Sequence, residues 1–335
     1  MKEKIRSKQF TILNLRLLKQ TDSNAFKTIR SNQVMKKLYS NKLVIFSLVL
    51  PGLLLFFFAI LAPICLSVYY GFTDYSGMGS MNFIGMENYK NLMTDKAFWM
   101  SLRNSLLLAI GFICIQHPLA LITAAVLDKL SGKAEGFFRC VYFIPNVISV
   151  AVIAYLWKFI YNPNFGLLNN IIKAFGGKGN INWLSQQNAI WSVLVVLIWH
   201  GFGWGMLIYY TGIKNIDPVL YEAAAIDGAD QRTTFLKITL PLMKPVIQVN
   251  VTMAIISALK QMETVYLLTN GGPGNSTQFA ANYLYQQAFK AFKYGYGNAI
   301  GVVFIIICLV TTVVLNTIFA DREDKPVKAK RRRAA

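Results

Sequence analysis

Few side chains of this 335-residue sequence are spaced for covalent or metal chemistry. The two histidines, His117 and His200, lie in different apolar stretches, without a Cys, Asp or Glu near enough in sequence to complete a metal site. The sequence has neither the G-x-x-x-x-G-K-S/T motif, whose backbone would cradle a nucleotide phosphate, nor an H-E-x-x-H motif. Glu263 is the only acidic residue within a long apolar stretch. We therefore expect no catalytic residue, no metal site and no nucleotide cofactor in this chain.

One polar stretch, 215–245 (NIDPVLYEAAAIDGADQRTTFLKITLPLMKP), has the features of two short helices joined by a turn. Asp217 followed by Pro218 is typical of a helix start, and Gly228 favours the left-handed turn that ends a helix. We expect a second helix over roughly 230–240, closed by Pro241. Small residues on this knob permit close approach by a partner, and acidic residues orient it; they are Ala223, Ala224, Ala225, Glu222, Asp227 and Asp230.

The elements that must position these residues are predicted from apolar length. The sequence is 55% hydrophobic and 15% charged, with a mean hydropathy of +0.43, so it has too little polar sequence to cover a water-facing globule. A helix that crosses about 30 Å of hydrocarbon needs about 20 apolar residues. We therefore expect an all-α membrane protein with six transmembrane helices, over 43–70, 101–127, 137–160, 189–212, 246–268 and 298–319.

Basic residues indicate the orientation of these spans. If the N-terminus is cytoplasmic, the inner segments hold 25 Lys and Arg and the outer loops hold 6, so the positive-inside rule favours cytoplasmic placement of both termini. The net charge of +19 is concentrated in the basic tails that we expect over 1–42 and 320–335, beside anionic lipid headgroups. The membrane domain is expected over 43–319. This segregation of charge argues against a nucleic-acid-binding protein.

The outer loop between the third and fourth spans carries apolar residues at helical spacing over 164–176. This pattern predicts an amphipathic helix. We expect it at the outer membrane surface, with a lid that packs on the helix bundle as the alternative.

The 215–245 stretch resembles the EAA loop of binding-protein-dependent ABC importer permeases. In that loop Glu-Ala-Ala is followed after three residues by Gly, and after nine more residues by Ile-x-Leu-Pro. This sequence has Glu222-Ala223-Ala224, then Gly228, then the run from Ile238 to Pro241, so every position and spacing matches. The loop also falls on the side predicted to be cytoplasmic.

The resemblance extends from about residue 43 to 319 and is to the carbohydrate branch, similar to maltose- and glycerol-phosphate-type permeases. The basic N-terminal extension lies outside the shared region, and the large outer domain and extra N-terminal spans of the maltose-type relative are missing. The branch assignment rests on shorter motifs in the same order: YYGFTDY (69–75), FIGMENY (83–89), FFRCVYFIP (137–145), NPNFGLLN (162–169) and TNGGPGNST (269–277).

The resemblance implies the fold of a type I ABC importer permease, a transport subunit rather than an enzyme, in a bacterial plasma membrane. Its implied partners are a second homologous permease, two ATPase subunits that bind ATP and Mg²⁺, an external solute-binding protein and membrane lipid. Closure of the ATPases would rock the helices between inward-facing and outward-facing states. The residues implied in ATPase coupling are Glu222, Ala223, Ala224, Asp227, Gly228 and Pro241, with Glu222 as the anchor.

A sugar site would need groups that match hydroxyls and an aromatic face near mid-membrane. The fourth span offers the run WHGFGWG (199–205), and the fifth offers Ser257, Lys260 and Gln261 on one face. By resemblance the sugar contacts fall near Gly201, Trp204, Ser257 and Gln261, and an unpaired Lys260 would favour an acidic sugar. Other interpretations stay open: glycines for helix packing, Trp at interfaces, and a Lys260–Glu263 pair.

Two functions from other classes compete with an importer subunit. A stand-alone secondary transporter would show inverted repeats and ionisable residues at the membrane midplane, and neither is evident. A membrane-embedded enzyme is disfavoured because no catalytic constellation is present. Copurification with an ATPase would separate the importer from both alternatives.

Overall fold

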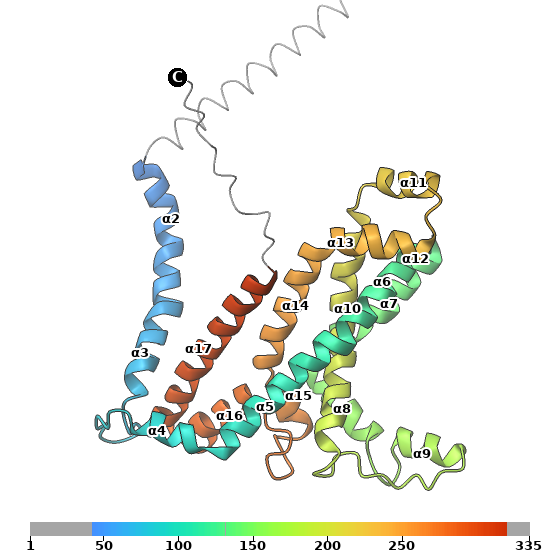
Figure 1. Ribbon diagram of the computed structural model, residues 1–335. Helices are drawn as coiled ribbons and strands as arrows, with labels where there is room; N and C mark the ends of the chain where they lie inside the picture. Colours follow the sequence, from blue (N-terminus) through green and yellow to red (C-terminus); the bar gives the residue numbers. More distant parts are fainter. Residues whose placement is uncertain (1–41, 131, 320–335) are drawn as a thin grey trace, which may run out of the picture. The chain divides into compact units, whose positions relative to one another are not determined.

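The computed structural model describes residues 42–130 and 132–319, and these are arranged as helices joined by short turns and loops (Figure 1). The chain divides into two units, residues 1–66 and 67–335, which are described separately. The predicted basic tails lie outside the described residues, apart from Lys42. Within the described part, one isolated β-bridge, between Thr73 and Phe83, is the extent of the extended pairing. The prediction of an all-α chain is thus confirmed for these residues.

Four described helical stretches are long and apolar enough to cross a membrane. They contain the predicted spans 43–70, 101–127, 189–212 and 298–319. The first combines α2 (Lys42–Phe56), a π-helical turn η1 (Phe57–Leu61) and α3 (Ala62–Tyr70); the second combines α5 (Lys96–Gly111), η2 (Phe112–Gln116) and α6 (His117–Asp128); the others are α10 (Ala189–Lys214) and α17 (Tyr294–Phe319).

Two bent pairs of helices raise the count of candidate spans to six if each pair is one span. One falls in the predicted span 137–160, and the other joins Gln231–Leu242 to Lys244–Leu259 with a bend of 67°. The predicted span 137–160 is two helices, α7 (Lys133–Val147) and α8 (Val150–Ile160), which meet at 96°. The bend lies beyond Pro145, because Ile148 is extended and the Ser149 side chain caps the next helix by accepting from the Val152 N–H.

The predicted span 246–268 is also interrupted. Helix α14 (Lys244–Leu259) ends where Lys260 occupies the C-cap, a position at which the helix dipole favours a cation. After Met262 the chain starts a separate short helix, α15 (Glu263–Leu268). The outer segments continue with α16 (Ala280–Tyr285) and the π-helical turn η4 (Gln286–Lys290), while α4 (Glu87–Thr94) precedes α5.

Three prolines follow a π-helical turn by two residues: Pro63 after η1, Pro118 after η2 and Pro241 after η3 (Phe235–Thr239). Proline lacks an N–H and its ring clashes with the carbonyl four residues earlier, and the wider π turn relieves that clash. The loop's second helix therefore ends two residues later than predicted, where the chain bends by 67° into the next helix. The helix continues through α13 (Leu240–Leu242), and the Met243 N–H donates to the Thr239 carbonyl at 2.9 Å.

Helix α10 is the centre of the packing in the unit 67–335. On one side its Met206 and Tyr209 are buried against Ala120 and Ala124 of α6. Gly203 lies so close to α7 that an added Cβ would be 2.3 Å from the Tyr142 carbonyl oxygen. Apolar burial gives little net driving force in lipid, so such close contact stabilises through van der Waals packing. For Gly203, the helix-packing interpretation of the glycine run is the one the structure supports.

The predicted amphipathic helix in 164–176 is α9 (Leu167–Ala174). Leu168 packs on the main core cluster, and the fully buried Asn169 side chain donates to the carbonyls of Pro163 and Ile181. This anchoring agrees with a lid that packs on the bundle.

Candidate functional site

The knob predicted over 215–245 consists of α11 (Pro218–Ile226), a turn and α12 (Gln231–Thr234), which runs into η3. The Asp217 carboxylate caps α11 by accepting from the Val219 N–H at 3.0 Å. Gly228 has a φ of +73°, the left-handed conformation that ends the helix. The Asp230 side chain caps α12 by accepting from the Thr233 N–H at 3.0 Å. Hydrogen bonds from Thr233 hold the pKa of Asp230 below its usual value, so the cap stays ionised.

The outer face of the knob is open to a partner. Glu222 and Asp227 are exposed and take no part in the ion pairs found between described residues, Arg139–Glu135 and Lys214–Asp128. Ile226 is 86% exposed and Val219 is 61% exposed, whereas Ala224 is buried at 6%. Pro241 is exposed within the continuing helix. An exposed apolar surface with two carboxylates at its edge is typical of a surface that binds a protein partner.

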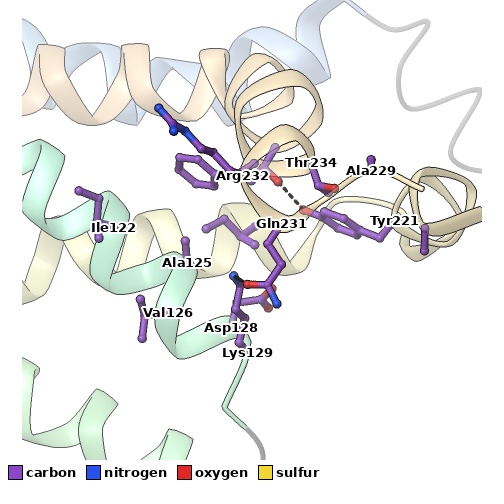
Figure 2. Close-up of a pocket in the computed structure, with 14 residues that line it drawn as sticks. Ile122, Ala125, Val126, Asp128, Lys129, Tyr221, Ala229, Gln231, Arg232 and Thr234 are labelled. Atoms are coloured by element: carbon purple, nitrogen blue, oxygen red, sulfur yellow. Dashed lines mark hydrogen bonds between the residues drawn. The ribbon is translucent and has the colours of Figure 1, made fainter. Parts of the chain in front are cut away.

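The inner face of the knob lies against the end of α6, where Figure 2 shows Gln231 beside Asp128 and Lys129. Tyr221 of α11 shares a hydrogen bond with Thr239 of η3 at 3.2 Å. The Lys129 ammonium, just beyond α6, donates to the Gln231 side-chain carbonyl at 2.6 Å. Lys214 pairs with Asp128 at 2.9 Å. A largely apolar cavity of about 680 Å³ lies between the knob and the ends of α6 and α10. Since α10 continues into the knob through residues 215–217, we expect a movement of the knob to reach α10 and, through Lys129, α6.

A second cavity, of about 420 Å³, lies between η2, α6, α7, α10 and α14. It brings together four of the five residues predicted to contact solute: Gly201 and Trp204 of α10, Ser257 of α14, and Gln261 just beyond α14. Trp204 is 55% exposed, which leaves its ring available for stacking. The volume is within the range of small-molecule sites.

The fifth predicted residue, Lys260, does not line this cavity. Its side chain is exposed. No ion pair joins it to Glu263, although both residues are described. Neither the predicted contact with solute in this cavity nor the alternative pairing is therefore present for Lys260 in this conformation.

The cavity wall also contains polar residues that the sequence analysis missed. Gln116 donates through Nε2 to the Gly201 carbonyl at 3.2 Å, and Asn250 donates to the Gly205 carbonyl at 3.1 Å. His117 Nδ1 lies 2.8 Å from the Tyr209 hydroxyl. The available signal was the adjacent polar pair Gln116-His117 inside an apolar span, which is costly in lipid unless it has a role.

Within residues 42–130 and 132–319, no three His, Cys, Asp or Glu side chains are grouped so that they could hold a metal ion. All the cavity-lining side chains are among these residues, and none of them is Asp, Glu, Lys or Arg. Amide, imidazole, hydroxyl and indole groups match the hydrogen-bonding and stacking needs of a polyhydroxylated solute.

Comparison with known proteins agrees with this geometry. Residues 116–324 match the family described as binding-protein-dependent transport system inner membrane component. The chain is 37% identical over 289 residues to the probable ABC transporter permease protein YurN of Bacillus subtilis (strain 168), a match that covers 85% of this chain and 99% of YurN. It is 32% identical over 295 residues to the multiple sugar-binding transport system permease protein MsmF of Streptococcus mutans, covering 86% of this chain and 96% of MsmF.

The fold is also similar to a solved structure. A chain of the bacterial alginate ABC transporter, crystallised with an alginate pentasaccharide-bound periplasmic protein, superposes with a TM-score of 0.74. The match covers 85% of this chain and 96% of that chain at 21% identity, so it concerns the fold alone.

Proposed function

The chain belongs to the family of binding-protein-dependent transport system inner membrane components, and from this premise we propose that it carries an oligosaccharide through an ATP-driven importer. As a member of this family it is a multi-pass membrane transport subunit and not itself an enzyme. The observation that supports a sugar substrate most is the cavity of about 420 Å³ lined by Gly201, Trp204, Ser257 and Gln261. The relative MsmF is a permease of a multiple sugar-binding transport system.

The knob is the proposed docking site for an ATPase subunit. Its open face, with Ile226 and Val219 exposed beside Glu222 and Asp227, supports this role. We assign the coupling contacts to Glu222, Ala223, Ala224, Asp227, Gly228 and Pro241, with Glu222 as the charged anchor. Because Lys129, just beyond α6, binds Gln231 of the knob and α10 runs directly into the knob, a pull on the knob would move two helices that border the solute cavity.

The proposed assembly contains a second homologous permease, two ATPase subunits and an external solute-binding protein. ATP and Mg²⁺ would bind to the ATPases and not to this chain. Both termini are proposed to be cytoplasmic, which places the knob inside and the loops around α9 and α15 outside; Figure 1 shows these groups at opposite ends of the unit 67–335. The substrate would pass between the two permeases by alternating access.

Reconstitution tests the proposal. The chain is coexpressed with its candidate permease, ATPase and binding-protein partners, purified, and placed in liposomes. Uptake of radiolabelled maltotriose, lactose, raffinose and diacetylchitobiose is then measured, after a thermal-shift screen of the same sugars on the binding protein. We expect uptake that needs both ATP and the binding protein. Uptake driven by an ion gradient without ATP, or no ATPase in the purified complex, would contradict the importer assignment.

A further inference from the structure

Two adjacent polar side chains of the second helical stretch are buried in the wall of the solute cavity. Gln116 ends η2 and His117 begins α6, and each is only 4% exposed. Both belong to the cavity lining, on a different helix from Ser257 and Gln261. A buried polar side chain in an apolar span is expensive, so each of its hydrogen-bonding atoms needs a partner.

Each of the two side chains has one atom with a partner and one without. Gln116 Nε2 donates to the Gly201 carbonyl, but Gln116 Oε1 has no hydrogen-bond partner in the protein. His117 Nδ1 meets the Tyr209 hydroxyl, but His117 Nε2 has none. Asn146 Nδ2, from α7 and the same cavity, is a third such atom. Three unpartnered polar atoms around one cavity indicate that its occupant supplies the missing hydrogen bonds.

A purely structural role accounts for only half of these atoms. Polar side chains often join membrane helices, and the Gln116–Gly201 and His117–Tyr209 contacts do this between η2 or α6 and α10. Joining helices leaves Gln116 Oε1 and His117 Nε2 unused. Both atoms are shielded from solvent in this conformation, so a ligand would reach them when the helices separate during alternating access.

The chemistry of the wall defines the class of ligand. One amide carbonyl oxygen, one imidazole nitrogen and one amide N–H can bind hydroxyl groups, and none of the side chains that line the cavity is Asp, Glu, Lys or Arg. We propose that Gln116 and His117 are sugar-binding residues that hold hydroxyls of an uncharged sugar ring, facing Ser257 and Gln261 across the cavity. This inference rests on the proposed function, because it deepens the assignment of the same cavity.

Tyr209 is the positioning residue of this set. Its hydroxyl fixes the His117 ring through Nδ1, and the two rings lie 5.6 Å apart in an edge arrangement. The Tyr209 side chain is not part of the cavity lining, so it acts through His117. Tyr209→Phe should therefore weaken the same sugar contact as a change of His117, and by a smaller factor.

The test uses the complete reconstituted importer and the sugar of the four-member panel that it transports. Gln116→Met and His117→Phe remove the unpartnered atoms while they keep the side-chain volume close to that of the wild type. We expect each to raise the KM for uptake about tenfold, since a hydrogen bond to the sugar is lost. Monodeoxy derivatives of the sugar are then measured with each variant. Removal of the hydroxyl that Gln116 binds should raise the KM of the wild type and leave the KM of Gln116→Met unchanged.

Asn282→Leu is the matched control. Asn282 of α16 is fully buried, donates one hydrogen bond to Gln278 at 2.6 Å and has an unpartnered Oδ1, but it lies outside the cavity lining. It therefore reports the effect of removing a buried amide as such. The proposal is overturned if the three variants change the KM alike. It is also overturned if removal of each sugar hydroxyl raises the KM of the variants as much as that of the wild type.

Failure of the two proposals gives different results. If wild-type liposomes take up none of the panel with ATP, the proposed function fails and this inference with it. If the wild type transports and Gln116→Met and His117→Phe keep its KM, only this inference fails. Should one variant not assemble, as seen by gel filtration, Gln116→Asn and His117→Gln with the deoxy series decide the question.

Discussion

At the scale of single residues, Gly228 is the position whose backbone a side chain would strain. Its φ of +73° is left-handed, and nothing lies within 4 Å of an added Cβ, so a substitution there costs conformational energy without a clash. The cost of a non-glycine residue in this conformation is about 1–2 kcal/mol. The residue sits at the exposed corner between α11 and α12, where the shape of the knob is set.

We expect Gly228→Asp to uncouple ATP hydrolysis from uptake. The strain changes the corner, and the new carboxylate lies between Asp227 and Asp230, so docking of the ATPase weakens. Coupled uptake should fall about tenfold, which is the size of effect that 1–2 kcal/mol gives, while ATP hydrolysis continues. Uptake and phosphate release are measured on the same liposomes.

Gly132→Asp is the control for this prediction. Gly132 also has a positive φ, +67°, with nothing within 4 Å of an added Cβ, but it precedes α7 and not the knob. It should leave the number of sugars carried per ATP unchanged. Wild-type uptake by Gly228→Asp would show that the corner has no coupling role.

The residues of the solute cavity show how far single positions could be predicted. Ser257 and Gln261 were found because two polar residues recur on one helical face in an apolar stretch, and both line the cavity. Gln116 and His117 were missed, although they are an adjacent polar pair, because their meeting with Gly201 and Tyr209 depends on how α6 packs on α10. The position of Lys260 was missed for a similar reason, since the end of α14 turns it away.

At the scale of elements, Asp95 joins three helices. Its carboxylate caps α5 through the N–H groups of Ala97 and Phe98, and it accepts hydrogen bonds from Tyr283 of α16 and Tyr296 of α17, both at 2.5 Å. Burial opposes ionisation of Asp95, but these hydrogen bonds outweigh it and hold its pKa below the usual value. Asp95 therefore holds the three helices together as an ionised carboxylate.

The sign of the pH dependence follows from this lowered pKa. The contribution of the carboxylate to stability is fully present above the unfolded pKa of about 3.9 and is lost as the pH falls through the folded pKa. Asp95→Asn replaces one acceptor by an N–H donor that faces a tyrosine hydroxyl, so it should destabilise the folded protein by about 1–3 kcal/mol at pH 7. Thermal unfolding in detergent should show that the difference in stability between the wild type and Asp95→Asn becomes smaller below about pH 4. A stability difference that does not change with pH would contradict an ionised Asp95 carboxylate.

The hydrogen bond between Tyr221 and Thr239 holds α11 against η3. Tyr221→Phe removes one hydrogen bond, worth about 0.5–1.5 kcal/mol, and should loosen the knob. We expect fewer sugars carried per ATP with an unchanged KM, because Tyr221 does not line the solute cavity. Tyr155→Phe, which alters a 60% exposed tyrosine of α8, is the control. An equal loss with both variants would contradict a role for this tie.

The pattern of prolines explains which elements could be predicted. Helix starts at Asp217 and Asp230 follow local rules, and both caps are present. Pro241 was read as a stop because proline breaks a regular helix, yet the preceding π turn lets the helix continue to Leu242. A π turn has no clear mark in a single sequence, since it is stabilised by tertiary packing. Pro145 indicates a kink in the predicted span 137–160, but the turn itself lies three residues later, at Ile148, where Ser149 caps α8.

At the scale of the whole molecule, the charge distribution predicts which loops face outward. Labelling with a membrane-impermeant maleimide tests this in a background without Cys65, Cys114, Cys140 and Cys308. We expect Ser80→Cys, in an exposed outer loop, to react in intact cells, and Ala225→Cys, in the exposed knob, to react only after permeabilisation. The positive-inside rule gives the direction. The reverse pattern would contradict the proposed orientation.

The lengths of the apolar stretches predicted more of the whole chain's structure than any other feature of the sequence. They predicted an all-helical membrane protein and the approximate bounds of four long helices. The two bent pairs could not be predicted, because hydropathy records length and not direction. The exposed surfaces of α2 and α17 show the same limit, since hydropathy does not say whether lipid or a second permease covers them.

The uncharged lining of the solute cavity has a consequence for energetics. Moving one elementary charge across a membrane potential of 100 mV changes its free energy by about 2.3 kcal/mol. The described side chains around the cavity carry no Asp, Glu, Lys or Arg, and a neutral sugar adds no charge to them. If the solute is the uncharged sugar proposed above, it carries no charge across the membrane, and we expect the voltage neither to assist nor to oppose its passage.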